Sequence, residues 1–172
     1  MTETASPSPE IAVVGVGNEI MADDGIGPRM IAALESQPAV ATEAIRLYDA
    51  GTTAFLALEA MSGCDRAIVV DAIETGSEPG TVQEYRYVDG AFDGEAPDMT
   101  MHDVSFTEAL GYTDGTYDLP DEMLVVGIEP KRLEPGTELS EPVENAIPAA
   151  TDVILDYAAA AADRSKHVVT TE

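Results

Sequence analysis

The chain has 172 residues, 45% of them hydrophobic, which suits a single domain with a substantial core and argues against broad disorder. Its 33 acidic and 8 basic residues give a formal net charge of −25, so nucleic acids and anionic membrane surfaces are poor candidate partners. The longest apolar runs are too short to span a bilayer, and the N-terminus lacks a signal-peptide pattern.

The acidic residues are spread along the chain and do not form one tail. Such a charge repels itself at low salt, whereas molar salt shortens the Debye length to about 3 Å and screens the repulsion. We interpret the composition as adaptation to a saline cytoplasm; the alternative is an ordinary acidic protein. The single cysteine, Cys64, excludes an intramolecular disulfide and fits a reducing, cytoplasmic compartment.

After an expected disordered leader at residues 1–9, the sequence IAVVGVGNEIMADDGIG gives the first structural signal. Its apolar, β-branched start predicts a buried strand over residues 11–16, followed by a tight turn at two glycines. Asp23 and Asp24 come just before a helical pattern that ends near residue 37. A carboxylate at that place is expected to cap the helix and to meet the positive end of its dipole.

Two further strands are predicted over residues 44–48 and 67–70, separated by a helix over 54–62. They end in Asp49 and Asp71. A strand, a glycine turn and a helix in this order are typical of a doubly wound α/β domain, in which the carboxyl ends of parallel strands build the site. Right-handed crossovers bring all these acidic strand ends to the same edge of the sheet.

The alternation of strands and helices then breaks. Residues 80–88 favour a strand, and the link from Asp71 is too short for a crossover helix, so we expect an antiparallel edge strand. His102 stands directly before a predicted helix over residues 103–110, and the last buried strand is predicted over residues 123–128.

The final helix carries apolar residues at steps of three and four. Ser140 is placed to cap it, and Pro148 predicts a kink or a break. A flexible tail is expected over residues 163–172, which leaves one α/β domain over residues 10–162.

Two kinds of site are poorly supported. Gly15 and Gly17 supply only the first two glycines of a dinucleotide fingerprint, because Ile20 occupies the third position, where close packing of helix on strand needs a glycine. Cys64 lies in an apolar context that favours a buried structural thiol over a nucleophile. No serine stands in a nucleophile-elbow motif.

A metal site is the third candidate. Asp24, Asp71 and His102 can each stand at the same edge of the sheet. Two carboxylates and one imidazole suit a divalent transition metal and leave positions open for ligands from a partner. Each residue also has a simpler interpretation: Asp24 as a helix cap, Asp71 as a solvated strand end, and His102 as a partner of nearby backbone.

The combination of motifs resembles the maturation endopeptidases of [NiFe] hydrogenases. The resemblance rests on VVGVGNEIMADDGIGPRMIAAL, DAGTT, AIVVDAI, the lone His102 before a helix, and VVGIEP, and it extends from about Ile11 to Tyr157. It implies a three-layer α/β sandwich with a twisted, mostly parallel five-stranded sheet, helices on both faces and one antiparallel edge strand. It also implies removal of a C-terminal extension from the large-subunit precursor after nickel insertion.

The resemblance assigns metal contact and catalysis to Asp24, Asp71 and His102, with nickel supplied by the precursor. The family often has Asp-Glu in the first loop where this chain has Asp23 and Asp24, so the choice between these two stays open. Its substrate-discriminating turn corresponds to Asp49, Gly51 and Thr52, and Ala50 stands where the family has a glycine. Two alternatives remain: a protease of the same fold with another protein target, and a module that binds nickel or precursor without cleaving.

Overall fold

The structure is a computed structural model that describes residues 10–42, 44–101, 104–112 and 115–168. Its centre is a six-stranded sheet in the order β2-β1-β3-β8-β4-β5. The strands are β1 (Ile11–Gly15), β2 (Ile45–Asp49), β3 (Arg66–Ala72), β4 (Val82–Val88), β5 (Ala91–Phe92) and β8 (Glu122–Ile128). Strands β2, β1, β3 and β8 are parallel, and β4 runs antiparallel to β8, which confirms the expected α/β class.

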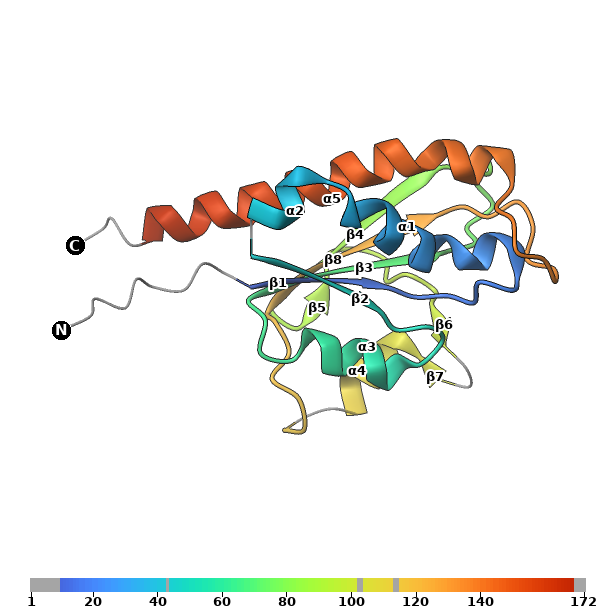
Figure 1. Ribbon diagram of the computed structural model, residues 1–172. Helices are drawn as coiled ribbons and strands as arrows, with labels where there is room; N and C mark the ends of the chain where they lie inside the picture. The colour runs from blue at the N-terminus through green and yellow to red at the C-terminus, as the bar shows by residue number, and fades with distance from the viewer. Residues whose placement is uncertain (1–9, 43, 102–103, 113–114, 169–172) are drawn as a thin grey trace.

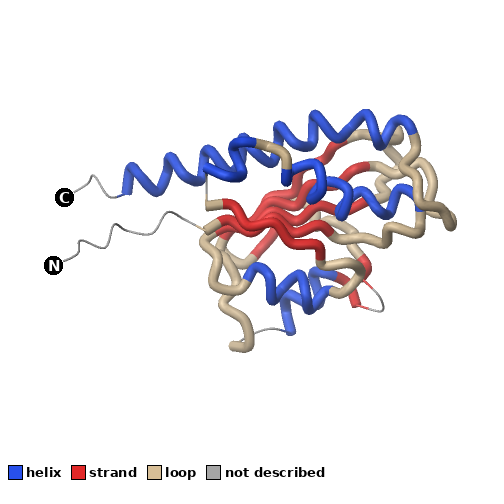
Figure 2. Tube along the Cα trace, viewed as in Figure 1, coloured by secondary structure: helices blue, strands red, loops and turns tan. Residues whose placement is uncertain are grey.

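Helices cover both faces of the sheet, as Figures 1 and 2 show. They are η1 (Ala22–Gly25), α1 (Ile26–Glu35), α2 (Pro38–Thr42), α3 (Ala54–Met61), α4 (Phe106–Tyr112) and α5 (Glu141–Val168). Helices α1, α2 and α5 lie on one face, and α3 and α4 lie on the other. No helix in the described part of the chain has the length and apolarity that a membrane crossing needs.

The two apolar layers follow from the alternation of side chains along each buried strand. Val13, Ile68 and Leu124 face the core under α1 and α5, whereas Val14 and Val69 face the core over α3 and α4. All five are fully buried. Strands buried on both faces read as continuous apolar runs, which is why the sequence revealed them.

The prediction of five strands was wrong. β5 adds a sixth strand outside β4, pairing Tyr87 with Phe92, and a separate hairpin joins β6 (Thr100–Met101) to β7 (Val104–Ser105). Each of these strands is two residues long, which is too short for an alternation of apolar and polar side chains to be recognised in the sequence. The predicted start of a helix at residue 103 was also wrong, because Val104–Ser105 pairs as a strand and the helix begins at Phe106.

The last helix also differs from expectation. α5 is continuous through Pro148, so of the predicted kink or break, the break does not occur. The helix extends to Val168, and the flexibility of residues 163–172 stays a prediction. Ser140 precedes the helix, yet its hydroxyl donates to Asp23 and is not a cap; only its backbone carbonyl accepts from a helix amide, that of Glu144.

Close packing of the first helix on the first strand is achieved by a glycine that the fingerprint does not contain. A Cβ on Gly27 would clash with the carbonyl oxygen of Val16, and one on Gly15 would lie 2.5 Å from the carbonyl oxygen of Gly27. Ile20, which occupies the fingerprint's third position, is instead 64% exposed. The expectation that Ile20 stands where this packing needs a glycine was therefore wrong, because Gly27, seven residues later in the first turn of α1, makes the contact.

Candidate active site

The site is built where the first loop crosses the carboxyl end of β3. The amide of Val16 donates to the carbonyl of Val70 at 2.9 Å, which fastens the start of the loop to β3. The loop then turns into η1, which packs against β3. Within it, the amide of Asn18 donates to Oδ2 of Asp24 at 3.0 Å. The carboxylate of Asp24 is therefore held at the end of the sheet by the backbone of its own loop.

Asp71 is the second carboxylate at this edge. It lies near the end of β3 opposite Gly127 of β8, and only 5% of its surface is exposed. The amide of Ala72 donates to its Oδ1 at 2.9 Å. Burial, and secondly the negative charge of Asp24, raise the pKa of the Asp71 carboxyl well above its ordinary value of 3.8. The charge on Asp24 therefore affects the protonation of Asp71.

Asp24 shows a weaker form of the same perturbation. Burial raises the pKa of its carboxyl, and the hydrogen bond from the Asn18 amide acts in the opposite direction. Two partly dehydrated carboxylates that repel each other are typical of sites that take up a cation. The simpler interpretations of both residues fail, because Asp71 is not solvated and Asp24 makes no cap bond to η1 or α1.

Asp23 has an entirely different environment from its neighbour. It is fully buried, and its Oδ2 accepts from the amides of Lys131 and Arg132, each at 2.8 Å. Ser140 donates its amide to Oδ1 at 2.7 Å and its hydroxyl to Oδ2 at 2.8 Å. Burial alone raises the pKa of the Asp23 carboxyl, but these donors outweigh it, and the net pKa lies below the ordinary value. Asp23 joins the first loop to the loop before α5 and caps no helix.

A third buried carboxylate, missed by the sequence analysis, holds the loop after β3. Glu129 is 6% exposed; its Oε2 accepts from the amide and hydroxyl of Thr75 and its Oε1 from the amide of Gly76. The signal was present in VVGIEP, because an acidic residue directly follows the buried strand β8. Asp23 and Glu129 therefore each fix a loop next to the Asp24 and Asp71 carboxylates.

The predicted substrate turn adjoins the first loop. Oδ1 of Asp49 accepts from the amide of Gly51 at 2.9 Å, and the carbonyl of Gly51 accepts from the amide of Gly17 at 2.8 Å. Gly51 takes the positive φ of 56° that the turn requires, whereas Ala50 is buried in an ordinary conformation. Asp49, Gly51 and Thr52 line a cavity of about 320 Å³ together with Asn18, which holds Asp24.

His102 lies outside the described residues. Within the residues that are described, no three His, Cys, Asp or Glu side chains gather closely enough to hold a metal ion, so Asp24 and Asp71 form a pair. Two carboxylates with one backbone donor each fit part of the ligand set of a divalent metal. Cys64 is buried, and burial raises the pKa of its thiol, which is the opposite of what a nucleophile needs.

Comparison with known proteins decides the family. Residues 28–157 match the family model described as hydrogenase maturation protease. This chain belongs to the hydrogenase maturation protease family. The resemblance inferred from the motifs is thereby confirmed, and with it the endopeptidase class.

Relatives and solved structures agree with this assignment. The chain is 33% identical over 147 residues to the hydrogenase expression/formation protein HupD of Rhizobium leguminosarum bv. viciae, covering 85% of this chain and 72% of that protein. It is 31% identical over 151 residues to the hydrogenase 2 maturation protease of Escherichia coli K12, covering 84% and 88%. The structure of the hydrogenase maturating endopeptidase HybD from E. coli superposes with a TM-score of 0.69 at 29% identity, covering 86% of this chain and 91% of that one.

Proposed function

We propose that this hydrogenase maturation protease removes the C-terminal extension from the nickel-loaded precursor of a [NiFe] hydrogenase large subunit, in the cytoplasm. The observation that supports this most directly is the pair of mutually repelling carboxylates at the carboxyl edge of the sheet, the buried Asp71 and the half-buried Asp24. Family membership supplies the reaction class, and the pair supplies a place where a metal ion carried by the precursor can bind.

The roles of the residues follow from their charges. Nickel in the precursor would dock against Asp24 and Asp71 and offset the burial and the repulsion by Asp24 that together raise the pKa of Asp71. His102 would complete the O,O,N set. In this way the enzyme would act only on a precursor that already contains its metal, since the metal itself supplies the contact. The scissile carbonyl could then be polarised by nickel, or a carboxylate could activate water; both routes use the same side chains.

The test is the intact mass of a nickel-loaded large-subunit precursor, incubated with and without this protein in molar potassium chloride. The expected result is a nickel-dependent mass loss equal to the C-terminal extension. An unchanged mass, with nickel confirmed in the precursor and the protein folded, would contradict the proposal and leave a different target or a non-cleaving binding role.

His102 needs a separate experiment because the structure does not describe it. We expect a folded His102→Ala variant to lose processing of the nickel-loaded precursor. The matched control is His167→Ala, which replaces the only other histidine. Retained cleavage by His102→Ala would remove His102 from the mechanism while leaving the carboxylate pair to be tested on its own.

A further inference from the structure

One long edge of the sheet is unoccupied in the described part of the chain. β2 pairs with β1 on one side and has no strand on the other, and it forms the near side of the sheet in Figure 2. The amide of Ile11 donates to the carbonyl of Ala44, and the amide of Ala50 donates to that of Gly15. In a parallel pair this alternation turns the backbone groups of Ile45, Leu47 and Asp49 outward. Such an edge is a template for an added strand.

A cavity of about 420 Å³ lies along this edge, between β2 and α3. Its lining includes Arg46, Tyr48 and Asp49 of β2 and Leu56, Glu59 and Ala60 of α3. Asp49 also lines the 320 Å³ cavity that reaches Asn18, so the two cavities meet at this residue. We call the two together the β2 trough. The trough extends from the start of β2 to the first loop, whose backbone binds the carboxylate of Asp24.

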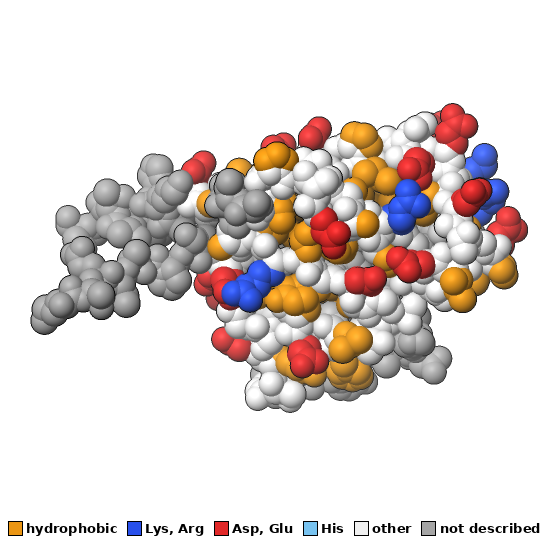
Figure 3. All heavy atoms as spheres, in the orientation of Figure 1, with side chains coloured by type: hydrophobic (Ala, Val, Ile, Leu, Met, Phe, Trp, Pro, Cys, Tyr) orange, Lys and Arg blue, Asp and Glu red, His pale blue; other side chains and the backbone are white. Residues whose placement is uncertain are grey.

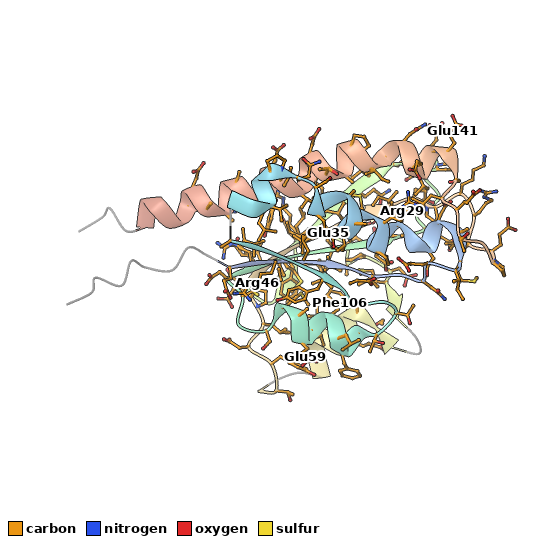
Figure 4. The ribbon with its side chains drawn as sticks, in the orientation of Figure 1. Arg29, Glu35, Arg46, Glu59, Phe106 and Glu141 are labelled. Carbon is orange, nitrogen blue, oxygen red and sulfur yellow. The ribbon has the colours of Figure 1, made fainter. Side chains whose placement is uncertain are left out.

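The lining of the trough combines apolar and acidic side chains. Leu56 is 51% exposed, and Figure 3 shows hydrophobic side chains gathered over α3 on this face. Arg46, the single basic residue of the lining, pairs with Glu10 at 2.6 Å. Within the described chain, no basic side chain lies within ion-pair distance of Asp49 or Glu59. Figure 4 labels Arg46 on β2 and Glu59 on α3, which both line the 420 Å³ cavity.

These features specify an occupant. We propose, on the basis of the proposed function, that the β2 trough binds the C-terminal segment of the precursor as an extended strand paired with β2, and that a Lys or Arg of this segment enters the cavity beside Glu59. The aliphatic part of such a side chain lies on Leu56, and its cationic end is attracted by Glu59 and Asp49. The five residues of β2 span about 17 Å of strand.

A second copy of this chain fits the trough poorly. Two copies would bring together net charges of −25 each, and each copy offers only 8 basic residues to an acidic cavity. An extended segment of another protein needs only one basic residue and a free backbone. The position of the trough also suits a substrate, because the bound strand would run toward the Asp24 loop, where cleavage is proposed.

The test compares two exposed acidic residues. Glu59→Lys reverses the charge of the trough, and Glu35→Lys makes the same charge change at the end of α1, away from it. With nickel-loaded precursor at the lowest salt concentration at which the protein stays folded, we expect Glu59→Lys to raise KM about tenfold with kcat little changed, as loss of uniform binding does, and we expect molar potassium chloride to reduce this difference. Glu35→Lys should behave as the unmodified protein. Thermal unfolding of both variants confirms that each is folded.

A charge exchange makes the test specific. A precursor in which the basic residues of the extension are replaced by Glu should be a poor substrate for the unmodified enzyme and should be restored by Glu59→Lys. Equal KM values for Glu59→Lys and Glu35→Lys would overturn the trough assignment while leaving the protease function intact. The assignment would also be overturned if the trough were a contact between two copies of this chain. Sedimentation would then show a dimer of the unmodified protein that Glu59→Lys dissociates. Absence of cleavage by the unmodified enzyme would instead refute the proposed function.

Discussion

Asp23 and Asp24 are neighbours in the sequence with identical side chains, yet the fold gives them opposite environments. Four donors from residues 131–140 surround the carboxylate of Asp23 and keep its pKa low. Asp24 receives one backbone donor and faces Asp71, and the pKa of both members of this pair is raised. The ionised carboxylate of Asp23 stabilises the fold. The carboxylates of Asp24 and Asp71 repel each other, and a bound cation would remove this repulsion.

The strongest test of this contrast is Asp71→Asn. The amide keeps an oxygen for the Ala72 N–H but carries no charge, so it no longer repels Asp24. We expect cleavage to fall by at least about 100-fold while thermal stability at pH 7 rises. Proteolysis assays and thermal unfolding of the same sample measure both effects. A variant that loses activity and also loses stability would contradict the idea that this pair is strained.

Asp23→Ala should have the largest effect on stability. It leaves the amides of Lys131, Arg132 and Ser140 and the hydroxyl of Ser140 without their acceptor. Losing buried hydrogen bonds to a charged group should lower the free energy of unfolding by about 3 kcal/mol. Asp24→Ala is the matched control, because it removes a single backbone bond and should cost far less. Equal losses in denaturant titrations would show that the two environments do not differ as described.

The pH dependence of stability should have opposite signs for the two environments. The folded pKa of Asp71 is raised above 3.8, so the folded state binds more protons and stability falls as the pH rises from 3.8 through the folded pKa. The folded pKa of Asp23 is lowered, so its contribution is complete above 3.8 and is lost as the pH falls below that value. The free energy of unfolding of Asp71→Asn, subtracted at each pH from that of the unmodified protein, gives the pH dependence that Asp71 contributes. A difference that does not change with pH would contradict the raised pKa of Asp71.

The smallest effect is expected for Ser140→Ala. It removes the hydroxyl donor to Asp23 and leaves three backbone donors in place, so it should cost about 1 kcal/mol. Ser36→Ala is the control, because the exposed Ser36 hydroxyl donates only to the carbonyl of Ala33. Thermal unfolding should separate the two variants; identical midpoints would mean that the Ser140 hydroxyl contributes nothing to the Asp23 cluster.

The parts of the fold that the sequence predicted correctly have local causes. The run ending at Gly15 and the run ending at Asp71 are apolar and β-branched over several residues, which few structures other than a buried strand satisfy. The short link after Asp71 was enough to predict the antiparallel β4. These motifs also predicted the family, and the family model that matches residues 28–157 confirms that prediction.

The parts that the sequence did not predict depend on partners far away in the chain. Nothing near Asp23 distinguishes it from Asp24; the difference comes from residues 108 to 117 positions later. Ser140 was expected to cap α5 for the same reason, since only the fold shows that its hydroxyl is needed by Asp23. The role of Asp24, Asp71 and His102 as a metal-contacting set stays a prediction, and so does the saline environment inferred from the charge. Unfolding at low and molar potassium chloride tests the latter.

The bonds between Asp23 and Ser140 also have a consequence for how the protein is made. The four donors to the Asp23 carboxylate are translated 108 to 117 residues after Asp23 itself. The first loop therefore cannot reach the hydrogen-bonded state described here until Ser140 has also been synthesised. An enzyme that is proposed to act on the completed state of another polypeptide thus itself depends on a bond between an earlier and a much later part of its own chain.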